Sequence, residues 1–346
     1  MCKEHHPLST IKDIAAEAGV SVMTVSNVIN HNHARVSAAT EKRIREIMEK
    51  HNYTPNMVAR SLISKSSRII MLLLPIWYSD SASILLDPYA GQVVGMLEEI
   101  LREQKYYVML CSFEQPEQVL NMQQTWQVDG AILIMPHTDP VTRKLVRTSR
   151  TPLVVMDRHF DDLQMLSVGL DDFSGGYLGT KHLLELGHRA IGFAAPEITD
   201  SEVIHQRYLG YLKALGEYQV SENQAWVFDH VFREEGGEHV AAEIAAMKER
   251  PSAMVTTADL IACGIVKGCQ SMGIRVPDDL SVIGFDDSMP AQLISPALTT
   301  IGQDIRLKAQ TAVDMLMRAI RDSSYRNDSK LLDVSLVERN SASSPC

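Results

Sequence analysis

Polar side chains follow several apolar runs in the long second part of the chain, at positions where they could bind a small polar molecule. The candidates are Asp157 and Arg158 after LVVM, Asp259 after MVTT, and Asp286 and Asp287 after SVIGF. Arg207, within HQRYLGY, adds a further cation. Carboxylates together with a guanidinium fork are the groups that orient a polyhydroxylated or purine-like ligand. The alternative is that each acidic residue caps the following helix, which explains a single residue better than the set.

The segments around these residues alternate between short apolar runs and longer helical stretches. The apolar runs after Arg68 are IIMLLLP, YYVMLC, GAILIM, LVVMD, AIGFAAP, VFD, SAMVTT and LSVIGFDD. The predicted helices cover 91–104, 116–127, 140–149, 175–186, 205–217, 236–250, 260–272 and 304–320. Strands that are apolar throughout and separated by helices are typical of parallel sheets covered on both faces. The pattern therefore predicts two α/β lobes with a cleft between them, and ligands bind such sheets outside the carboxyl ends of the strands.

A second kind of chemistry is indicated near the N-terminus, where Thr10 opens the stretch TIKDIAAEAGVSVMTVSNVIN. Its spacing fits a helix-turn-helix. The motif needs a small residue where the two helices cross, which is Ala15, and a glycine in the turn, which is Gly19. It also needs apolar residues on the inner face of the second helix, which are Val25 and Val28. A third stretch, 40–51, places Ile44, Ile47 and Met48 on one face, so three short helices can share a core. A generic helical hairpin is the alternative.

The outward face of the second helix is where base contacts are expected, because that helix enters the major groove. Asn27 can pair with adenine through two hydrogen bonds, whereas Val22 and Met23 can only pack on thymine methyl groups. Thr24 and Ser26 suit phosphate or base contacts, and simple solvation is the alternative for each. The candidate DNA contacts of this module are these five residues together with the helix-capping Thr10 and Ser21.

The segment YTPNMVARSL, residues 53–62, predicts a short helix that begins after Pro55. A helix of about two turns is marginal alone in water, so this one should order only with help. Arg60 offers a cation to a phosphate or the minor groove. Leu62 either inserts between base steps of the DNA or packs onto the next domain, and the spacing alone does not distinguish these two roles. The candidate DNA contacts here are Asn56, Ala59, Arg60 and Leu62.

The net charge of −10 hides an asymmetry between the two parts of the chain. Residues 1–68 hold ten Lys and Arg against six Asp and Glu, whereas the remainder holds 23 against 37. A small basic head on a larger acidic body is expected when one part contacts phosphates and the other does something else.

Several protein classes are excluded by what the sequence lacks. The longest apolar run, 69–74, is far shorter than the roughly 20 residues of a membrane helix. Residues 1–7 are too short and polar to open a secretory signal, and five scattered cysteines without CxxC favour reduced thiols, so we expect a cytoplasmic protein. His5, His6, His31 and His33 lack partners at ligand spacing, so no metal site or cofactor is predicted.

The head resembles the DNA-binding domain and hinge helix of the lac-repressor (LacI/GalR) family, in which TIKDIAAEAGVSVMTVSNVIN, NYTPN and ARSL have counterparts. The resemblance implies a dimer whose paired hinge helices enter the minor groove, each inserting the leucine that corresponds to Leu62. Many members carry Arg or His in place of Asn27, and the HNHAR loop is longer than usual. The operator sequence therefore does not transfer from a relative.

The body resembles the same family throughout, through DGAILIMP, PLVVMDR, HLLELGHRAIGFAAP, QRYLGYLKAL, PDDLSVIGFDDS and PALTTIGQDIRLKAQTAVDML. The resemblance implies an effector domain similar to a sugar-binding periplasmic protein. Carried over by residue, it implies that the effector contacts Asp157, Arg158, Arg207 and Asp286, that Tyr89 and Phe232 form aromatic walls, and that Asp259 lies beside the pocket. Ala258 replaces a polar Asn of many sugar-responsive members, which weakens the assignment of a sugar.

We expect three domains: a helix-turn-helix domain at 1–54, a hinge helix and linker at 55–67, and an effector-binding and dimerisation domain at 68–346. The N-lobe of the last covers about 68–170 and 302–330, and its C-lobe covers about 171–301 and 331–346. The all-α head thus precedes an α/β body similar to type I periplasmic binding proteins.

The predicted function is sequence-specific regulation of transcription by a repressor, not catalysis. A small ligand, a sugar or sugar derivative by preference, controls affinity for a pseudopalindromic operator by biasing lobe closure in a homodimer. The end NSASSPC, without a leucine heptad, favours a dimer over a tetramer. The alternatives are a corepressor-dependent regulator with a purine-like ligand, an enzyme that uses Asp286 and Asp287 on a sugar, and a binding protein with a vestigial head.

Overall fold

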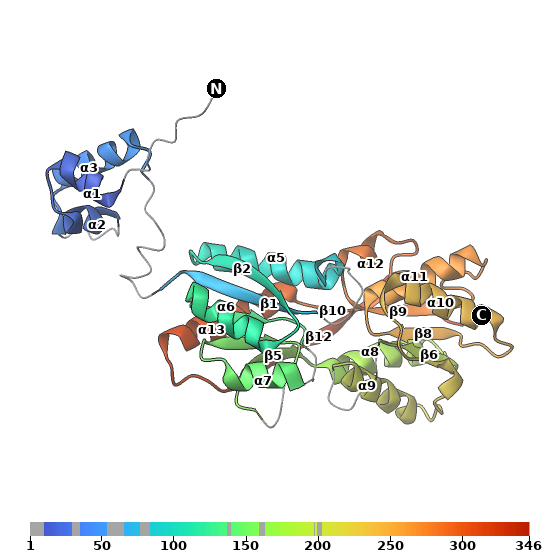
Figure 1. Ribbon diagram of the computed structural model, residues 1–346. Coiled ribbons are helices and arrows are strands. Elements are labelled where there is room, and N and C mark those ends of the chain that lie inside the picture. The colour runs from blue at the N-terminus through green and yellow to red at the C-terminus, as the bar shows by residue number, and fades with distance from the viewer. Residues whose placement is uncertain are drawn as a thin grey trace. The chain divides into compact units, whose positions relative to one another are not determined.

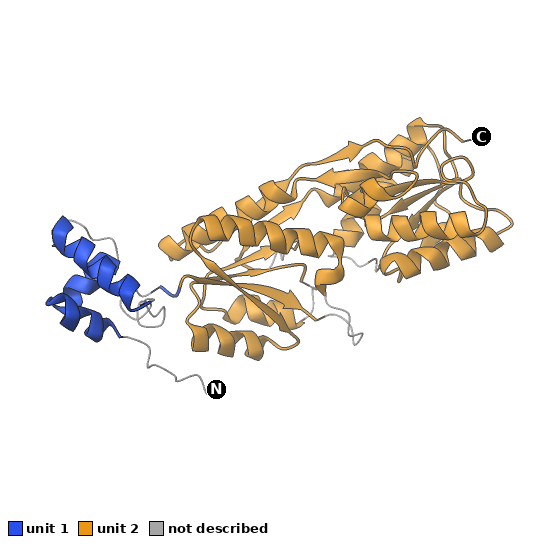
Figure 2. Cartoon of the chain, turned by 90° about the horizontal axis from the view of Figure 1, so that it is seen from above, with its two compact units in different colours: residues 1–67 blue, residues 68–346 orange. Residues whose placement is uncertain are grey.

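The computed structural model describes residues 10–29, 35–53, 66–76, 84–136, 140–158, 163–196, 198 and 203–345. The chain forms two compact units, residues 1–67 and 68–346, which we call the head and the body (Figure 2). The predicted hinge helix, 55–67, lies outside the described residues except for Ser66 and Ser67, which belong to neither a helix nor a strand.

The described residues of the head form three helices, α1 (Ile11–Ala18), α2 (Val22–Ile29) and α3 (Ala38–Lys50). The helix-turn-helix prediction is confirmed. Gly19 ends α1 in the left-handed conformation at φ 61°, which favours glycine because it has no Cβ. The predicted inner face is buried as a single small core, made of Ile14, Ala15, Ala18, Val25, Val28 and Ile44.

Within the described part of the body the strands form two six-stranded sheets, each covered by helices on both faces (Figure 1). The sheet of the N-lobe has the order β11-β5-β4-β3-β1-β2, and all its neighbours are parallel. Its strands are β1 (Ile69–Pro75), β2 (Tyr107–Phe113), β3 (Gly130–Leu133), β4 (Leu153–Met156), β5 (Leu166–Leu170) and β11 (Asp328–Leu332). Its helices are α5 (Pro88–Glu103), α6 (Pro116–Trp126), α7 (Pro140–Thr148) and α13 (Ile305–Arg321), with a short 3-10 helix η2 (Ile84–Leu86).

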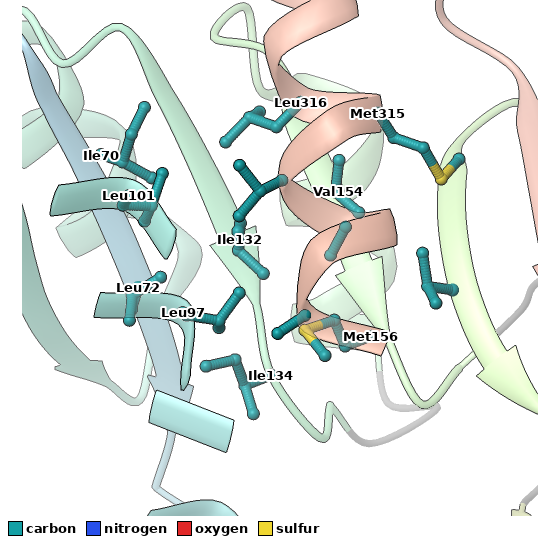
Figure 3. Packing of buried hydrophobic residues seen from close by; sticks show 14 of the residues in the cluster. Ile70, Leu72, Leu97, Leu101, Ile132, Ile134, Val154, Met156, Met315 and Leu316 are labelled. Carbon is teal, nitrogen blue, oxygen red and sulfur yellow. The ribbon is translucent and has the colours of Figure 1, made fainter. Parts of the chain in front are cut away.

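The N-lobe core shows why its strands are apolar throughout. Alternate residues of β1 point to opposite faces, so Ile70 and Leu72 pack in one cluster while Met71 and Leu73 pack in the other. In the first cluster the strands meet α5 and α13, as Figure 3 shows for Leu97, Leu101 and Leu316 around Ile132 and Val154. Both faces are therefore buried, as the parallel-sheet prediction requires.

The sheet of the C-lobe has the order β12-β10-β9-β8-β6-β7. Its strands are β6 (Ile191–Ala194), β7 (Val227–Phe228), β8 (Ala253–Thr256), β9 (Ser281–Asp286), β10 (Thr299–Gln303) and β12 (Val334–Val337). Its helices are α8 (Asp172–Glu185), α9 (Val203–Glu217), α10 (Arg233–Ala246), α11 (Asp259–Ser271) and α12 (Met289–Leu293), with the 3-10 helix η3 (Gln224–Trp226). α8 and α9 pack on one face, and α10 to α12 pack on the other.

The chain passes between the lobes three times, directly after β5, β10 and β11. A single residue, Asp333, separates β11 in one sheet from β12 in the other. Because the chain has no room for a helical crossover there, β12 pairs antiparallel with β10. This edge strand departs from the predicted all-parallel arrangement.

Candidate ligand site and DNA-binding helix

The outer face of α2 carries the predicted base contacts. Val22 is 41% and Met23 68% exposed, and Ser26 and Asn27 are half-buried on a helix whose inner face is fully buried. Adjacent exposed apolar side chains can contribute to a surface that contacts another molecule. The side chains of Val22 and Met23 are thus exposed on the outer face of α2.

Ser21 and Thr24 have a capping role within the head. The Ser21 hydroxyl accepts the backbone N–H of Thr24 at 3.1 Å, and the two hydroxyl oxygens lie 2.9 Å apart. Thr10 caps α1 in the same way, and its N–H and hydroxyl donate to the Asp13 carboxylate at 2.7 and 2.8 Å. Those bonds lower the pKa of Asp13. The hydroxyls of Ser21 and Thr24 are therefore engaged with each other before any DNA is bound.

Two ionic contacts tie the first helix of the head to the third. Glu17 on α1 accepts from Lys50 at 2.7 Å and lies in contact with His51 at the end of α3. The bond from Lys50 is the main reason why the pKa of Glu17 is lowered. The remaining predicted DNA contacts, Asn56, Ala59, Arg60 and Leu62, lie outside the described residues.

In the body, side chains from the carboxyl ends of both sheets meet in one hydrogen-bonded chain. Asp157 follows β4 of the N-lobe, and Asp286 ends β9 of the C-lobe. Lys308 on α13 forms an ion pair with Asp157 and donates to Gln303, whose amide donates to Asp286 at 2.7 Å. We call these four residues, with Tyr89 and Arg207, the interlobe site.

The backbone at both carboxylates is unusual. Asp157 has φ 61° and Asp286 has φ 118°, both in the left-handed region that side chains other than glycine rarely adopt. Strained residues of this kind concentrate at binding sites, where the surrounding fold holds them in place. Burial raises the pKa of the Asp286 carboxyl well above its usual range, and the nearby Arg207 opposes this.

Tyr89 enters the site through its hydroxyl. It begins α5 beside Pro88, is 9% exposed, and donates to Asp157 at 2.6 Å while accepting from Lys308 at 2.8 Å. Burial, followed by the charge of Asp157, raises its pKa well above the ordinary value. Tyr89 was predicted as an aromatic wall of the ligand pocket. The structure shows that its hydroxyl also joins Asp157 to Lys308 through hydrogen bonds.

Arg207 is held by a partner that the sequence analysis did not identify. Its Nε donates to Asp172 at 2.8 Å, and its Nη1 donates to the carbonyl of Thr257 at 2.6 Å. Its guanidinium lies over the ring of Phe285, 3.4 Å from the ring centre. Burial raises the pKa of Asp172, and the charge of Arg207 opposes this shift.

Two glycines allow this pair to form, because they let the helices that carry it approach closely. A Cβ on Gly176 of α8 would lie 1.9 Å from the carbonyl oxygen of Arg207. A Cβ on Gly210 of α9 would lie 2.1 Å from the carbonyl oxygen of Phe173. Both distances are below any real Cβ contact, so alanine at either position would push α8 and α9 apart.

Asp259 lies behind the site. It is 1% exposed and accepts three hydrogen bonds, from the N–H and hydroxyl of Ser288 at 2.7 and 2.9 Å and from Thr300 at 2.5 Å. Burial raises its pKa to about 6. These contacts agree with a place beside the pocket and fasten the segment after β9 to β10.

Arg158 and Phe232 are the remaining residues predicted to contact the ligand. Arg158 donates to the carbonyl of Pro136 at 3.0 Å, and Phe232 is half-buried just before α10. Its neighbour Arg233 acts electrostatically on Asp87 of the N-lobe, whose pKa is raised mainly by burial.

Asp287 differs from its neighbour Asp286 in its partner. Arg339 donates to Asp287 at 2.5 Å, and Arg339 also binds the carbonyl of Leu298. One carboxylate of the pair is therefore part of an ion pair within the C-lobe, and the other faces the N-lobe through Gln303. This arrangement is unlike two acids placed on either side of a glycosidic bond.

A hollow of about 350 Å³ lies elsewhere on the N-lobe, among Arg150, Leu153, Gln164 and Arg326 before β4, β5 and β11. It is at the amino ends of the strands, and none of the predicted ligand residues lines it. Ligands of such sheets bind at the carboxyl ends of the strands, which is where the interlobe site lies. In the described part of the chain no group of three His, Cys, Asp or Glu is arranged to hold a metal ion.

Comparison with known proteins gives matches to both units. Residues 10–56 match "Bacterial regulatory proteins, lacI family", and residues 180–342 match "Periplasmic binding protein-like domain". The HTH-type transcriptional repressor PurR of Pectobacterium carotovorum is 34% identical over 342 residues, covering 96% of this chain and 97% of the relative. PurR of Pasteurella multocida is 34% identical over 343 residues, covering 97% and 99%. This chain belongs to the LacI family.

Solved structures of the LacI family agree with this assignment. The lac repressor dimer bound to operator and the anti-inducer ONPF has a TM-score of 0.85 and 28% identity, covering 97% of this chain and 100% of that one. A LacI family regulator from Enterococcus faecium with bound ribose has a TM-score of 0.69 and 27% identity, covering 80% and 99%. The fold prediction is therefore confirmed for the head and the body.

Membership of the LacI family confirms the predicted function at the level of the family. The protein is a DNA-binding transcriptional repressor controlled by a ligand, and it is not an enzyme. The helices of the described residues include none that is both long and apolar enough to span a membrane.

The sequence analysis missed Lys308 and Gln303 of the interlobe site, and Asp172, the partner of Arg207. A signal for Lys308 was present, since it shares a helical face with Ala312 and Leu316, which are fully buried. A lysine on the core face of an amphipathic helix needs a counter-ion.

Proposed function

We propose that the ligand of this repressor binds at the interlobe site and contacts Asp286 and Asp157, with Arg207, Arg158, Tyr89 and Phe232 around it and Asp259 behind it. The single observation that carries this proposal is the hydrogen-bonded chain from Asp157 to Asp286, which joins the carboxyl ends of the two sheets. A ligand bonded to both lobes stabilises one lobe arrangement over the other, and only such a difference can change operator affinity.

The chemistry of the site favours a ligand rich in hydrogen-bond donors. Asp286 accepts from Gln303 through one oxygen, and carboxylates have capacity for further donors. Sugar hydroxyls meet this requirement, so a sugar or sugar derivative is our first candidate. The solved relatives include one with bound ribose. Arg207 beside Asp286 also offers a donor next to an acceptor, which fits the edge of a purine-like ring as the second candidate.

The DNA-binding surface proposed here is the outer face of α2, from Val22 to Asn27, completed by Thr10, Asn56, Ala59, Arg60 and Leu62. Support for this surface comes from the exposed Met23 and Val22 on a helix with a fully buried inner face. A pseudopalindromic operator requires two such faces, and therefore two chains.

The second chain is supplied by a homodimer in this proposal. The lac repressor structure described above was solved as a dimer bound to operator. In this chain β2 is the edge strand of the N-lobe sheet, with Tyr107 62% and Leu110 46% exposed. Exposed apolar side chains on an unpaired edge are suited to burial against a second copy. A repressor acts where its operator DNA is, so the proposed place of action is the cytoplasm.

The experiment that tests the ligand proposal is a thermal-shift panel on the full chain with sugars, sugar phosphates and purines. A ligand at 100 times its dissociation constant stabilises the folded chain by about 2.7 kcal/mol. Asp286→Asn should abolish the shift, whereas the matched Asp278→Asn, on the exposed Arg275 ion pair of the same lobe, should retain it. A shift that survives Asp286→Asn contradicts the proposed site.

A further inference from the structure

Lys308 is a charged side chain with no exposure, and each of its ammonium hydrogens has an acceptor. It forms an ion pair with Asp157, and it donates to the Tyr89 hydroxyl at 2.8 Å and to Gln303 Oε1 at 3.0 Å. An ammonium has three N–H donors, so its hydrogen-bonding capacity is filled.

The acceptors around this ammonium come from both lobes and are themselves held in place. The Tyr89 hydroxyl donates to the second oxygen of Asp157 at 2.6 Å, and the Tyr89 ring centre lies 5.1 Å from the ammonium. Gln303 belongs to β10 of the C-lobe, and its amide donates to Asp286. A carboxylate, a hydroxyl, an amide oxygen and an aromatic ring around one point form the coordination expected for an organic cation.

We propose that the interlobe site contains an organic-cation site filled by the chain's own Lys308, and that this lysine makes the effector site reject cationic ligands. With Lys308 in place Asp157 is already paired, as Arg207 is paired by Asp172. A cationic ligand at Asp157 must therefore displace a buried ammonium or lie beside it, and both are costly. An uncharged ligand can hydrogen-bond to Asp157 and leave the pair intact.

The effect on ligand choice rests on the proposed effector site, whereas the cation site rests on the contacts of Lys308 alone. The two can fail separately. A panel in which no sugar or purine shifts the wild-type chain contradicts the proposed ligand classes, and the amine experiment below decides the cation site without any effector.

The test removes the tethered cation and supplies it from solution. Lys308→Ala deletes three carbons and the ammonium, which n-propylammonium replaces atom for atom. Thermal unfolding of the full Lys308→Ala chain should shift upward and saturably with n-propylammonium, by roughly 3 °C or more at ten times the dissociation constant. Neither n-propanol on the same variant nor n-propylammonium on Lys267→Ala, which removes an exposed lysine paired with Glu238, should give this shift.

A shift that Asp157→Asn abolishes in the Lys308→Ala background supports the site, whereas the absence of any amine-specific shift overturns it. A second pair of variants decides the matter where Lys308→Ala does not fold. Lys308→Met keeps the volume without the charge, so Asp157→Asn should lower the unfolding midpoint of the wild-type chain and raise that of Lys308→Met. Effects of the same sign in both backgrounds overturn the proposal.

The selectivity is tested with matched sugars on the wild-type chain. D-glucose is paired with D-glucosamine, and D-galactose with D-galactosamine. Neither amino sugar should raise the unfolding midpoint above the effect of its parent. A larger shift with the amino sugar overturns the role of Lys308 in excluding cations, whatever the outcome of the amine experiment.

Discussion

The guanidinium of Arg207 donates to the carboxylate of Asp172 with both side chains only 10% exposed. The pair joins α9 to α8, and its guanidinium packs on the ring of Phe285, the residue before Asp286. The interlobe site is thus built on an ion pair that the C-lobe forms before any ligand arrives. The cost of removing one partner is the desolvation of the charge that remains.

Arg207→Met is therefore expected to destabilise the body strongly, by about 3–5 kcal/mol in urea unfolding. The matched control is Lys213→Met on the same helix, whose pair with Glu217 is exposed, and its loss should be below about 1 kcal/mol. Asp172→Asn added to Arg207→Met should recover part of the loss. An Arg207→Met variant as stable as Lys213→Met contradicts the account of this pair.

Asn27→Ala is expected to weaken binding to a selected operator by about 1–3 kcal/mol, because a bidentate contact to a base is lost. The free energy of unfolding should hardly change, since Asn27 is half-buried on the outer face of α2. Val28→Ala on the inner face provides the contrast and should destabilise the head. Fluorescence anisotropy with operator and with random DNA measures the effect. An equal loss on both DNAs would remove Asn27 from base recognition.

Leu110→Lys is expected to convert the proposed homodimer into monomers, because it places a charge on the exposed edge of β2. Leu331→Lys is the matched control, since Leu331 is 69% exposed on β11 at the opposite edge of the same sheet. Sedimentation equilibrium should give two chains for wild type and Leu331→Lys, and one for Leu110→Lys. A dimeric Leu110→Lys chain places the interface elsewhere.

The raised pKa of Asp259 predicts that its contribution to stability decreases as the pH rises, whereas a carboxylate with a lowered pKa contributes more at higher pH. Burial raises its folded pKa to about 6 from 3.8, so the folded chain holds this proton more tightly than the unfolded chain. The stability that the proton contributes is present below about pH 4 and is lost as the pH rises to about 6, with a size on the order of 3 kcal/mol.

Urea unfolding at pH 4.5 and 6.5 checks this dependence. Asp259→Asn should remove that loss, so the variant's stability should fall less between the two pH values than the wild type's. Asp279→Asn is the control, because hydrogen bonds from Arg275 lower the pKa of Asp279 to about 2, outside this window. Parallel pH profiles for wild type and Asp259→Asn are incompatible with a buried, proton-binding Asp259.

The head could be predicted closely from sequence because its signals are local. Gly19 has φ 61°, Thr10 and Ser21 cap their helices, and Val25 is buried. The turn and the two caps depend only on residues a few positions away, and the burial of Val25 follows from the periodic apolar pattern of the three short helices. The fully apolar strands of the body could be predicted for the same reason, since a buried parallel strand needs no distant information.

Two of the strands that sequence analysis missed, β10 and β11, lack such a local signal. β10 contains Thr299 and Thr300, which are buried because they hydrogen-bond to Ser341 and Asp259, far away in the sequence. β11 is largely exposed and polar, and α12 has five residues. Tertiary contacts override propensity in these segments.

The interlobe site was predicted in part. Strand ends located its carboxylates, because the carboxyl ends of parallel strands share an edge. Lys308 could not be placed by the same rule, since it lies on a helix of the N-lobe whose register relative to Asp157 depends on the crossover after Gln303. The partner of Arg207 likewise depends on how closely Gly210 lets α9 approach α8.

The most direct test of the account is the operator affinity of the full chain with and without the ligand identified by the thermal-shift panel. Binding at the interlobe site predicts that the ligand changes the wild-type operator dissociation constant by roughly fivefold or more. It also predicts that Asp286→Asn keeps the ligand-free operator affinity and loses the response. A response that persists unchanged in Asp286→Asn would contradict the account.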